Sequence, residues 1–183
     1  MSKITVTIQI SKARVLDEVA KTTEYIGSKA VNKEDPDAYE RIAVTDENRE
    51  QLDRYWMESC SEVTKMLDHW VTSVRSQMLS HHPEISSAYD YKVVLGLPTN
   101  WNSAYESVLK ELVMSYMVNM IAAKWLLLTN KNDAQEYATL ASGAQRQVMQ
   151  VLLIRKRPAP RKTGVVDDGL WHRADVWHRD EPW

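Results

Sequence analysis

The stretch that decides the fold is NWNSAYESVLKELVMSYMVNMIAAKWLLLT, residues 100–129, the most apolar part of the chain. Its apolar side chains recur at spacings of three and four, the period that gathers side chains on one face of an α-helix. The stripe consists of Trp101, Tyr105, Val108, Leu112, Tyr116, Met120 and Ala123, and it is widened by Leu109, Val113 and Met117. Because a helix that is apolar almost all round is covered by other elements, we expect a central core helix with Asn100 as its N-cap.

A membrane span is the alternative interpretation of so apolar a helix. Only the 12 residues between Glu111 and Lys124 lack charge, whereas a span needs roughly 18–20 such residues. The length therefore favours a core helix, and we expect no membrane contact.

Composition limits the class of protein. The chain has 183 residues, which predicts one helical domain over residues 1–157 and an appended arm over residues 158–183. The net charge of -2 argues against a general affinity for nucleic acid. A single cysteine, Cys60, excludes an internal disulfide and is compatible with a reducing cytosol. The first ten residues alternate apolar and polar side chains, so they do not predict a signal peptide.

Before the central helix, the pattern predicts two further helices. Ser11 is expected to cap a helix over residues 11–30, and residues 31–47 are interpreted as a connection around Asp35-Pro36. Thr45 is expected to cap a long amphipathic helix, roughly 50 Å in length, that ends at His81-His82-Pro83. Its apolar positions are Leu52, Trp56, Cys60, Val63, Leu67, Trp70, Val74 and Met78.

Two segments have the period of two that is typical of β-strands. In residues 4–10, β-branched residues alternate with polar ones, and residues 86–98 alternate in a similar way. The two strands can pair within one subunit or with a neighbouring chain, since an isolated two-stranded ribbon is marginal. The candidate inter-subunit residues are Ile4, Val6, Ile8, Tyr89, Tyr91 and Val93.

A last helix is predicted after the tight connection at residues 129–132. Asn132 is its expected N-cap, with Gln135 in the capping-box position. The buried stripe consists of Tyr137, Ala141, Ala144, Val148, Val151 and Leu152. The fold class is therefore mainly α, a four-helix bundle-like body with two short strands and an extended C-terminal arm.

The arm has a different character from the body. The motif Trp-His-Arg occurs twice, and tryptophans recur every six residues; the candidate partner-docking residues are Trp171, Arg173, Trp177, Arg179 and Trp183. Disordered tails are poor in aromatics, and Trp is enriched at interface hot spots, so the arm is expected to bind a partner. A basic cluster precedes it, formed by Arg155, Lys156, Arg157, Arg161 and Lys162. That cluster either complements the helix dipole in solvent or contacts DNA or an acidic protein surface.

No pattern in the chain indicates catalysis. A glycine-rich phosphate loop, a nucleophile elbow and a zinc-binding pattern are all absent from the sequence. Cys60 lies on an apolar stripe and is interpreted as a buried hydrophobe, and His81-His82 as a solvated helix end. We expect no enzymatic activity, no cofactor and no metal.

Three segments carry a resemblance: KARVLDEVAKTTEYIGSKA, VTDENREQLDRYWMESCSEVTKML and KWLLLTNKNDAQEYATLASGAQRQVMQVLLIRKRP. Together with the order of the elements, they resemble the head–tail connector (adaptor) proteins of tailed bacteriophages, most of all those of phages and prophages that infect Bacteroidetes. The resemblance covers roughly residues 3–158 and includes no diagnostic motif.

The resemblance implies a virion protein that is made in the host cytoplasm and lies at the portal vertex. It implies a ring, typically dodecameric, that sits beneath the portal protein, extends the DNA channel and offers a docking surface to tail or further ring proteins. In such proteins, C-terminal segments reach onto the portal, which here implies a role for the segment after Leu152. The rival hypothesis is a cytoplasmic helical adaptor or regulator that binds one partner through its Trp-rich arm. A DNA-binding regulator is a third hypothesis.

Overall fold

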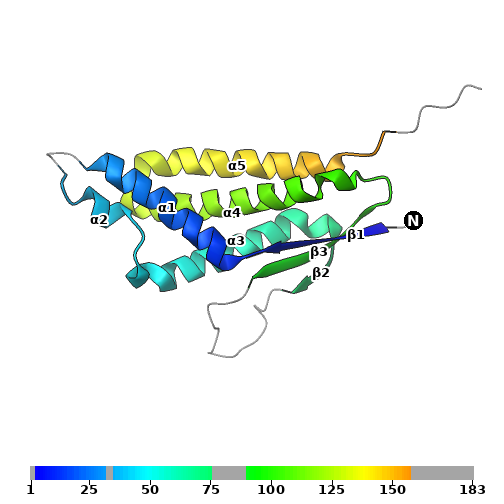
Figure 1. Cartoon of the computed structure of the whole chain (residues 1–183), viewed down its shortest axis with the longest axis horizontal. Helices are drawn as coiled ribbons and strands as arrows, with labels where there is room; N and C mark the ends of the chain where they lie inside the picture. Colours follow the sequence, from blue (N-terminus) through cyan, green and yellow to red (C-terminus); the bar gives the residue numbers. More distant parts are fainter. Residues whose placement is uncertain (1–2, 32–34, 76–89, 158–183) are drawn as a thin grey trace, which may run out of the picture.

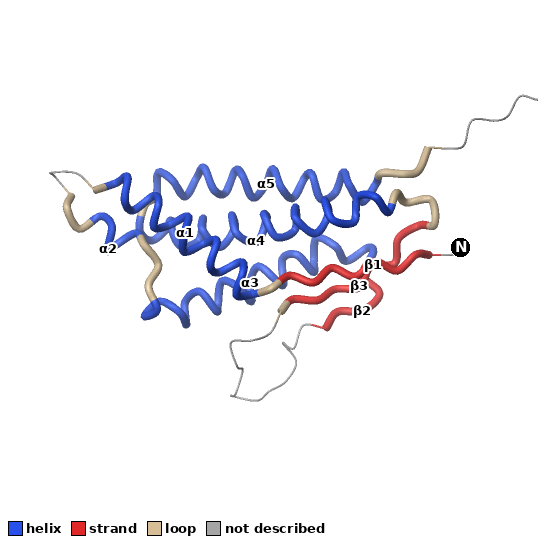
Figure 2. The backbone as a smooth tube through the Cα atoms, viewed as in Figure 1, coloured by secondary structure: helices blue, strands red, loops and turns tan. Residues whose placement is uncertain are grey.

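A computed structural model describes residues 3–31, 35–75 and 90–157. This part of the chain is mainly α-helical, as predicted, and it includes a small antiparallel sheet. Figure 1 shows α5 (Lys131–Leu153) alongside α4 (Glu106–Thr129), with α1 (Lys12–Ala30) crossing α4. The helix α3 (Arg49–Leu67) and the sheet lie on the side of α4 away from α5, as the tube in Figure 2 also shows.

The central helix exists, but it begins later than predicted. The 3-10 turn η4 (Ser103–Tyr105) precedes α4, and the side chain of Asn102 caps that turn by accepting a hydrogen bond from the Ala104 amide at 3.2 Å. The expected cap, Asn100, is instead an exposed residue of the turn that follows β3.

The most deeply buried line of α4 differs from the predicted stripe. Leu109, Val113, Met117 and Ile121 are all fully buried, whereas Val108 is 43% exposed and Leu112 and Met120 are half-buried. The residues that were predicted to widen the stripe therefore form its centre. The reason is geometric: α5 and the sheet approach α4 from different sides, so the buried arc is set by the neighbours and not by the period alone.

The sheet has the order β1-β3-β2, in which β1 (Lys3–Ile10) and β2 (Val71–Arg75) both pair antiparallel with β3 (Tyr91–Pro98). The two predicted strands are confirmed, and they pair within one chain. Ile4 lies opposite Leu97, Val6 opposite Leu95, and Ile8 opposite Val93. The inward side chains of β1 and β3 join the main core, together with residues of α1, α3, α4 and α5.

The predicted long helix is wrong beyond Leu67. After the 3-10 turn η2 (Asp68–Trp70), the chain forms β2, so α3 has 19 residues and spans roughly 28 Å. Val71 and Thr72 are β-branched residues that fit a strand, and pairing with β3 overrides the helical spacing of Trp70 and Val74. Met78, His81 and His82 lie outside the described residues.

The connection over residues 31–47 and several helix caps also differ from expectation. A short helix, α2 (Ala38–Ile42), lies within the connection and buries Ala38 and Ile42. Ser11 makes no side-chain cap; the Lys12 amide at the start of α1 donates instead to Asp90 at 3.2 Å.

Two more predicted caps are replaced by nearby asparagines. Thr45 donates to the side chain of Asn48, and a 3-10 turn, η1 (Asp46–Asn48), precedes α3. Asn130, not Asn132, is the N-cap residue of α5.

Among the described residues, one helical stretch, Ser103–Thr129, is long and apolar enough by length and composition to cross a membrane, a test that the core helix of a folded body also passes. Its length alone therefore does not separate the two interpretations. Its packing does: α4 contacts α1, α2, α3, α5 and β1, and its Tyr116 and Lys124 reach the carboxylates of α3. In this structure, α4 is the core helix.

We predict that Met117→Ala lowers the free energy of unfolding by roughly 2–5 kcal/mol, the cost of emptying a fully buried site. The matched control is Met120→Ala, one turn along the same helix at a half-buried position, which removes the same atoms and should cost clearly less. Urea unfolding followed by circular dichroism measures both. Equal losses would contradict the buried line Leu109–Val113–Met117–Ile121.

Candidate functional site

The last described residues are bound to the body at one end of the helical bundle. After α5 ends, Ile154 accepts a hydrogen bond from the Asn102 amide at 3.4 Å, and the Lys156 amide donates to the Asn100 carbonyl at 2.7 Å. Trp101 and Arg155 form a β-bridge between these two segments. The chain therefore reaches residue 157 along a defined path beside the turn that joins β3 to α4.

Trp101 holds this end together. Its side chain is fully buried, and its indole N–H donates to the Val151 carbonyl at 3.0 Å. Its main-chain N–H donates to the Pro98 carbonyl at 2.8 Å, which closes the turn after β3. One residue thus joins the sheet, the start of η4 and the last turn of α5. A buried indole needs such a partner for its N–H, and here the partner is the end of the helix that leads into the arm.

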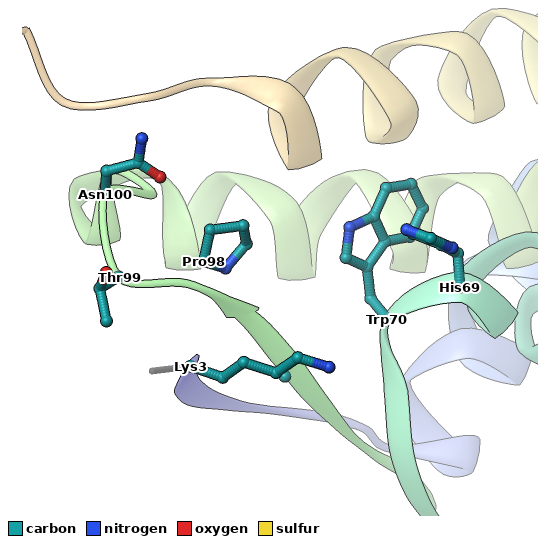
Figure 3. A pocket seen from close by; sticks show the side chains of 7 residues that line it. Lys3, His69, Trp70, Pro98, Thr99 and Asn100 are labelled. Atoms are coloured by element: carbon teal, nitrogen blue, oxygen red, sulfur yellow. The ribbon is translucent and has the colours of Figure 1, made fainter. Parts of the chain in front are cut away.

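A pocket of about 490 Å³ opens next to this turn. It is lined by Lys3, His69, Trp70, Gly96, Pro98, Thr99 and Asn100. Figure 3 shows that Lys3 comes from β1, Pro98, Thr99 and Asn100 from the end of β3, and His69 and Trp70 from η2. The rings of His69 and Trp70 meet edge to face, with centroids 5.2 Å apart. The half-buried Trp70 and Pro98 give the pocket an apolar wall.

Gly96 leaves room for two neighbouring side chains beside this pocket. A Cβ atom at position 96 would lie 2.7 Å from Cγ2 of Thr72 and 3.2 Å from Cδ of Lys3. The first distance is too short for two carbon atoms, so a larger residue would displace the neighbouring strand or the lysine. The side chains of Lys3 from β1 and Thr72 from β2 come close to β3 at this position, which explains the glycine.

The charge around the pocket is positive. Among the described residues that line it, none is acidic, and Lys3 is exposed. Lys156 and Arg157 are exposed on the segment that passes Asn100, while the Arg155 guanidinium donates to the Leu152 carbonyl at 2.9 Å. We call Lys3, Trp70, Pro98, Asn100 and residues 155–157 the exit site. An apolar wall with a cationic rim suits a ligand that has an aromatic ring next to a negatively charged group.

The structure places the predicted site residues unevenly. Arg155, Lys156 and Arg157 lie at the exit site, and Tyr91 and Val93 are paired with β1. Outside the described residues lie Arg161, Lys162, Trp171, Arg173, Trp177, Arg179, Trp183 and Tyr89. Sequence reasoning missed Lys3 and Trp70 as surface residues of one site, because Trp70 fitted the stripe of the long helix. The available signal was the run of β-branched residues that follows it.

A second pocket, of about 620 Å³, lies between α1 and the start of α3. Lys12, which is only 7% exposed, lines this pocket, and its ammonium lies 2.8 Å from Oδ1 of Asp53. This ion pair satisfies a buried cation and joins α1 to α3. Leu16, Val44 and Leu52 line the same pocket. Because the Lys12–Asp53 ion pair joins two walls of this pocket, we treat it as part of the packing of the body.

A polar cluster joins α3 to α4. The Lys124 ammonium lies 2.8 Å from Glu58 and 3.2 Å from Glu62, and Tyr116 donates to the other oxygen of Glu62 at 2.9 Å. Burial and the Glu62 carboxylate both raise the pKa of Tyr116. Burial opposes the charge on Lys124, but the two carboxylates outweigh it and raise the pKa of that ammonium. These groups are paired across two helices, which indicates a structural role.

Cys60 is buried within the main core, as predicted. Burial raises the pKa of its thiol to about 12, against an ordinary value of 9.0. A thiol with so high a pKa carries almost no thiolate near neutral pH. Among residues 3–31, 35–75 and 90–157, no group of three His, Cys, Asp or Glu side chains could hold a metal ion.

Comparison of the chain with protein-family models, with curated proteins and with solved structures finds no match in any of the three.

We predict that Trp101→Phe loosens the exit site. The change removes the indole donor to Val151 and shrinks the ring, at a cost on the order of 1–3 kcal/mol. Hydrogen exchange should quicken at the Asn102 and Lys156 amides, whose bonds depend on this junction. Trp70→Phe is the control, since it makes the same change on a half-buried ring. If both variants exchange like the parent protein, Trp101 does not hold this end together.

We predict that the Cys60 thiol resists iodoacetamide in the folded protein at pH 8 and reacts only as urea unfolds the chain. The folded state binds the thiol proton more tightly than the unfolded state does. This group's contribution to stability is therefore complete below pH 9 and is lost as the pH rises from about 9 to 12. Mass spectrometry of labelled protein checks the reaction. Rapid labelling without denaturant would contradict the buried thiol.

Proposed function

We propose that this protein is a virion structural component that assembles into a ring at the portal vertex, where it connects the capsid portal to the tail and extends the DNA channel. Two observations support the proposal. The first is the resemblance of residues 3–158 to head–tail connector proteins. The second is a helical body with a positively charged end, at which main-chain hydrogen bonds hold residues 154–157 in place.

The exit site is the observation that carries the proposal. The path of residues 154–157 is held by main-chain bonds to residues 100–102 and by the buried Trp101. A segment that follows such a path starts from a defined place on the body. An arm with three tryptophans in thirteen residues then supplies the aromatic anchors that dominate interface energies. Together they suit a protein that must attach to a large partner in one orientation.

The sheet offers a second means of assembly. Among the strands that the structure describes, β1 pairs on one edge only, with β3. Thr5, Thr7 and Gln9 are exposed along it. An eight-residue strand with an open edge is a template for a further strand, so contact between neighbouring copies through β1 is compatible with a ring.

We predict that the purified protein forms a ring with the portal protein of the same virus, and that deleting residues 164–183 abolishes this complex. The body should remain folded, because the elements from β1 to α5 bury a continuous core around α4. Mass photometry and negative-stain microscopy measure assembly, and circular dichroism checks the helices. The control is the full chain carrying Lys131→Glu, a charge change at an exposed position on the opposite end of α5.

Two results would contradict this function. The first is a full-length chain that stays monodisperse and monomeric with the portal present. The second is an arm-deleted chain that binds the portal as the full chain does. A complex with a single partner chain and no ring would instead support the adaptor hypothesis.

A further inference from the structure

We infer that the exit-site pocket is a docking site for the distal part of the arm of the same chain, residues 164–183, which inserts a tryptophan against Trp70 and Pro98 when the protein is alone. This inference goes beyond the proposed function, because it concerns the protein before any partner binds. The pocket and the portal are then alternative binding sites for the same segment of the arm.

Position is the first argument. The described chain ends at Arg157, and Lys156 is bonded to Asn100, which itself lines the pocket. Thirteen residues lie between Arg157 and Trp171, so this segment extends over at most roughly 45 Å and is long enough to turn back to the pocket. A tethered ligand also has an effective concentration in the millimolar range for short flexible linkers. The arm therefore starts at the rim of the pocket.

Charge is the second argument. Residues 164–183 contain five carboxylate side chains against two arginines. The described residues that line the pocket include no acidic one, and Lys3, Lys156 and Arg157 are exposed at this end of the body. A segment with net negative charge is attracted to this end of the molecule, and the attraction weakens with salt.

Shape and chemistry are the third argument. The pocket volume of about 490 Å³ falls within the range of roughly 300–1,000 Å³ that is usual for sites of small organic groups. Its wall is an indole and a proline ring, and its rim carries the Lys3 ammonium. An incoming indole can stack on Trp70 and meet the ammonium through its π face. Each tryptophan of the arm has an acidic residue within four positions of it in the sequence.

Photo-crosslinking of the full chain tests the inference. A p-benzoylphenylalanine residue replaces Thr99, which is exposed at the rim of the pocket, and mass spectrometry identifies the crosslinked peptide. The expected product joins position 99 to a peptide of residues 164–183 in the monomer band of a denaturing gel. The same photoreactive residue in place of Lys131, at the other end of α5, is the control and should not capture the arm.

Variants then separate a bound arm from a chance encounter. Lys3→Glu should lower the crosslink yield roughly two- to fivefold, the effect of one exposed charge pair, whereas Lys131→Glu should leave it unchanged. Replacing the anchoring tryptophan by Ala should lower the yield about tenfold or more. Testing Trp171→Ala, Trp177→Ala and Trp183→Ala one at a time identifies that anchor.

Two outcomes overturn the inference. In one, position 99 captures no peptide of the arm; in the other, it captures the arm only in a dimer band, which would mean that the arm belongs to a second copy. Both results are obtained on the protein alone. They are therefore independent of the portal experiment, and either proposal can fail without the other.

Discussion

The rest of the structure depends on the burial of α4 on nearly all sides. A helix with so wide an apolar surface cannot be covered by one neighbour, and here α1, α3, α5 and β1 each supply a face. Each of these elements is itself apolar on one side only, which leaves its other side for solvent. The indole groups at the two ends of the stretch fix its position along its axis: Trp101 donates to the Val151 carbonyl and Trp125 to the Ile42 carbonyl. The hydrophobic surface of α4 thus determines which elements pack against it, and the two indole hydrogen bonds fix the position of α4 relative to them.

Sequence periodicity correctly predicted the elements for which packing in the fold buries the same face that the local sequence makes apolar. The strand of Ile4, Val6 and Ile8 and the stripe of α5 match the structure because each has one clear apolar face. The segment after Leu67 was mistaken for helix because Trp70 and Val74 continue the helical spacing. What decides its conformation is the edge of β3, to which β2 is hydrogen-bonded. A partner some twenty residues away along the chain is not visible in a local pattern.

Some helix ends were predicted to the residue and others only to the neighbourhood. Ser11 is the N-cap residue of α1 and α4 ends at Thr129, as predicted, whereas α3, α4 and α5 begin at other residues than expected. Several Asn, Asp, Ser and Thr residues near each end could act as a cap, and the tertiary structure selects among them. Asp90 takes the place of Ser11 as the side-chain acceptor because the pairing of β1 with β3 brings it to the first turn of α1. The candidate site shows the same limit. The basic residues 155–157 could be singled out from the sequence, but Lys3 and Trp70 join them only through the fold.

The exit site brings together three parts of the chain that are far apart in the sequence: the turn after β3, the end of α5 and the pocket-lining residues of β1 and η2. The main-chain N–H of Trp101 closes the turn after β3, its side chain is buried in the core, and its indole N–H needs an acceptor, which the last turn of α5 provides. That bond draws the end of α5 toward the sheet, so the following residues pass beside Asn100 and the pocket. The place from which the arm starts is therefore a consequence of core packing. A change in the core at Trp101 would alter where the arm starts, even though no residue of the arm is touched. The stability of this end of the body and the starting point of the arm therefore depend on the same side chain.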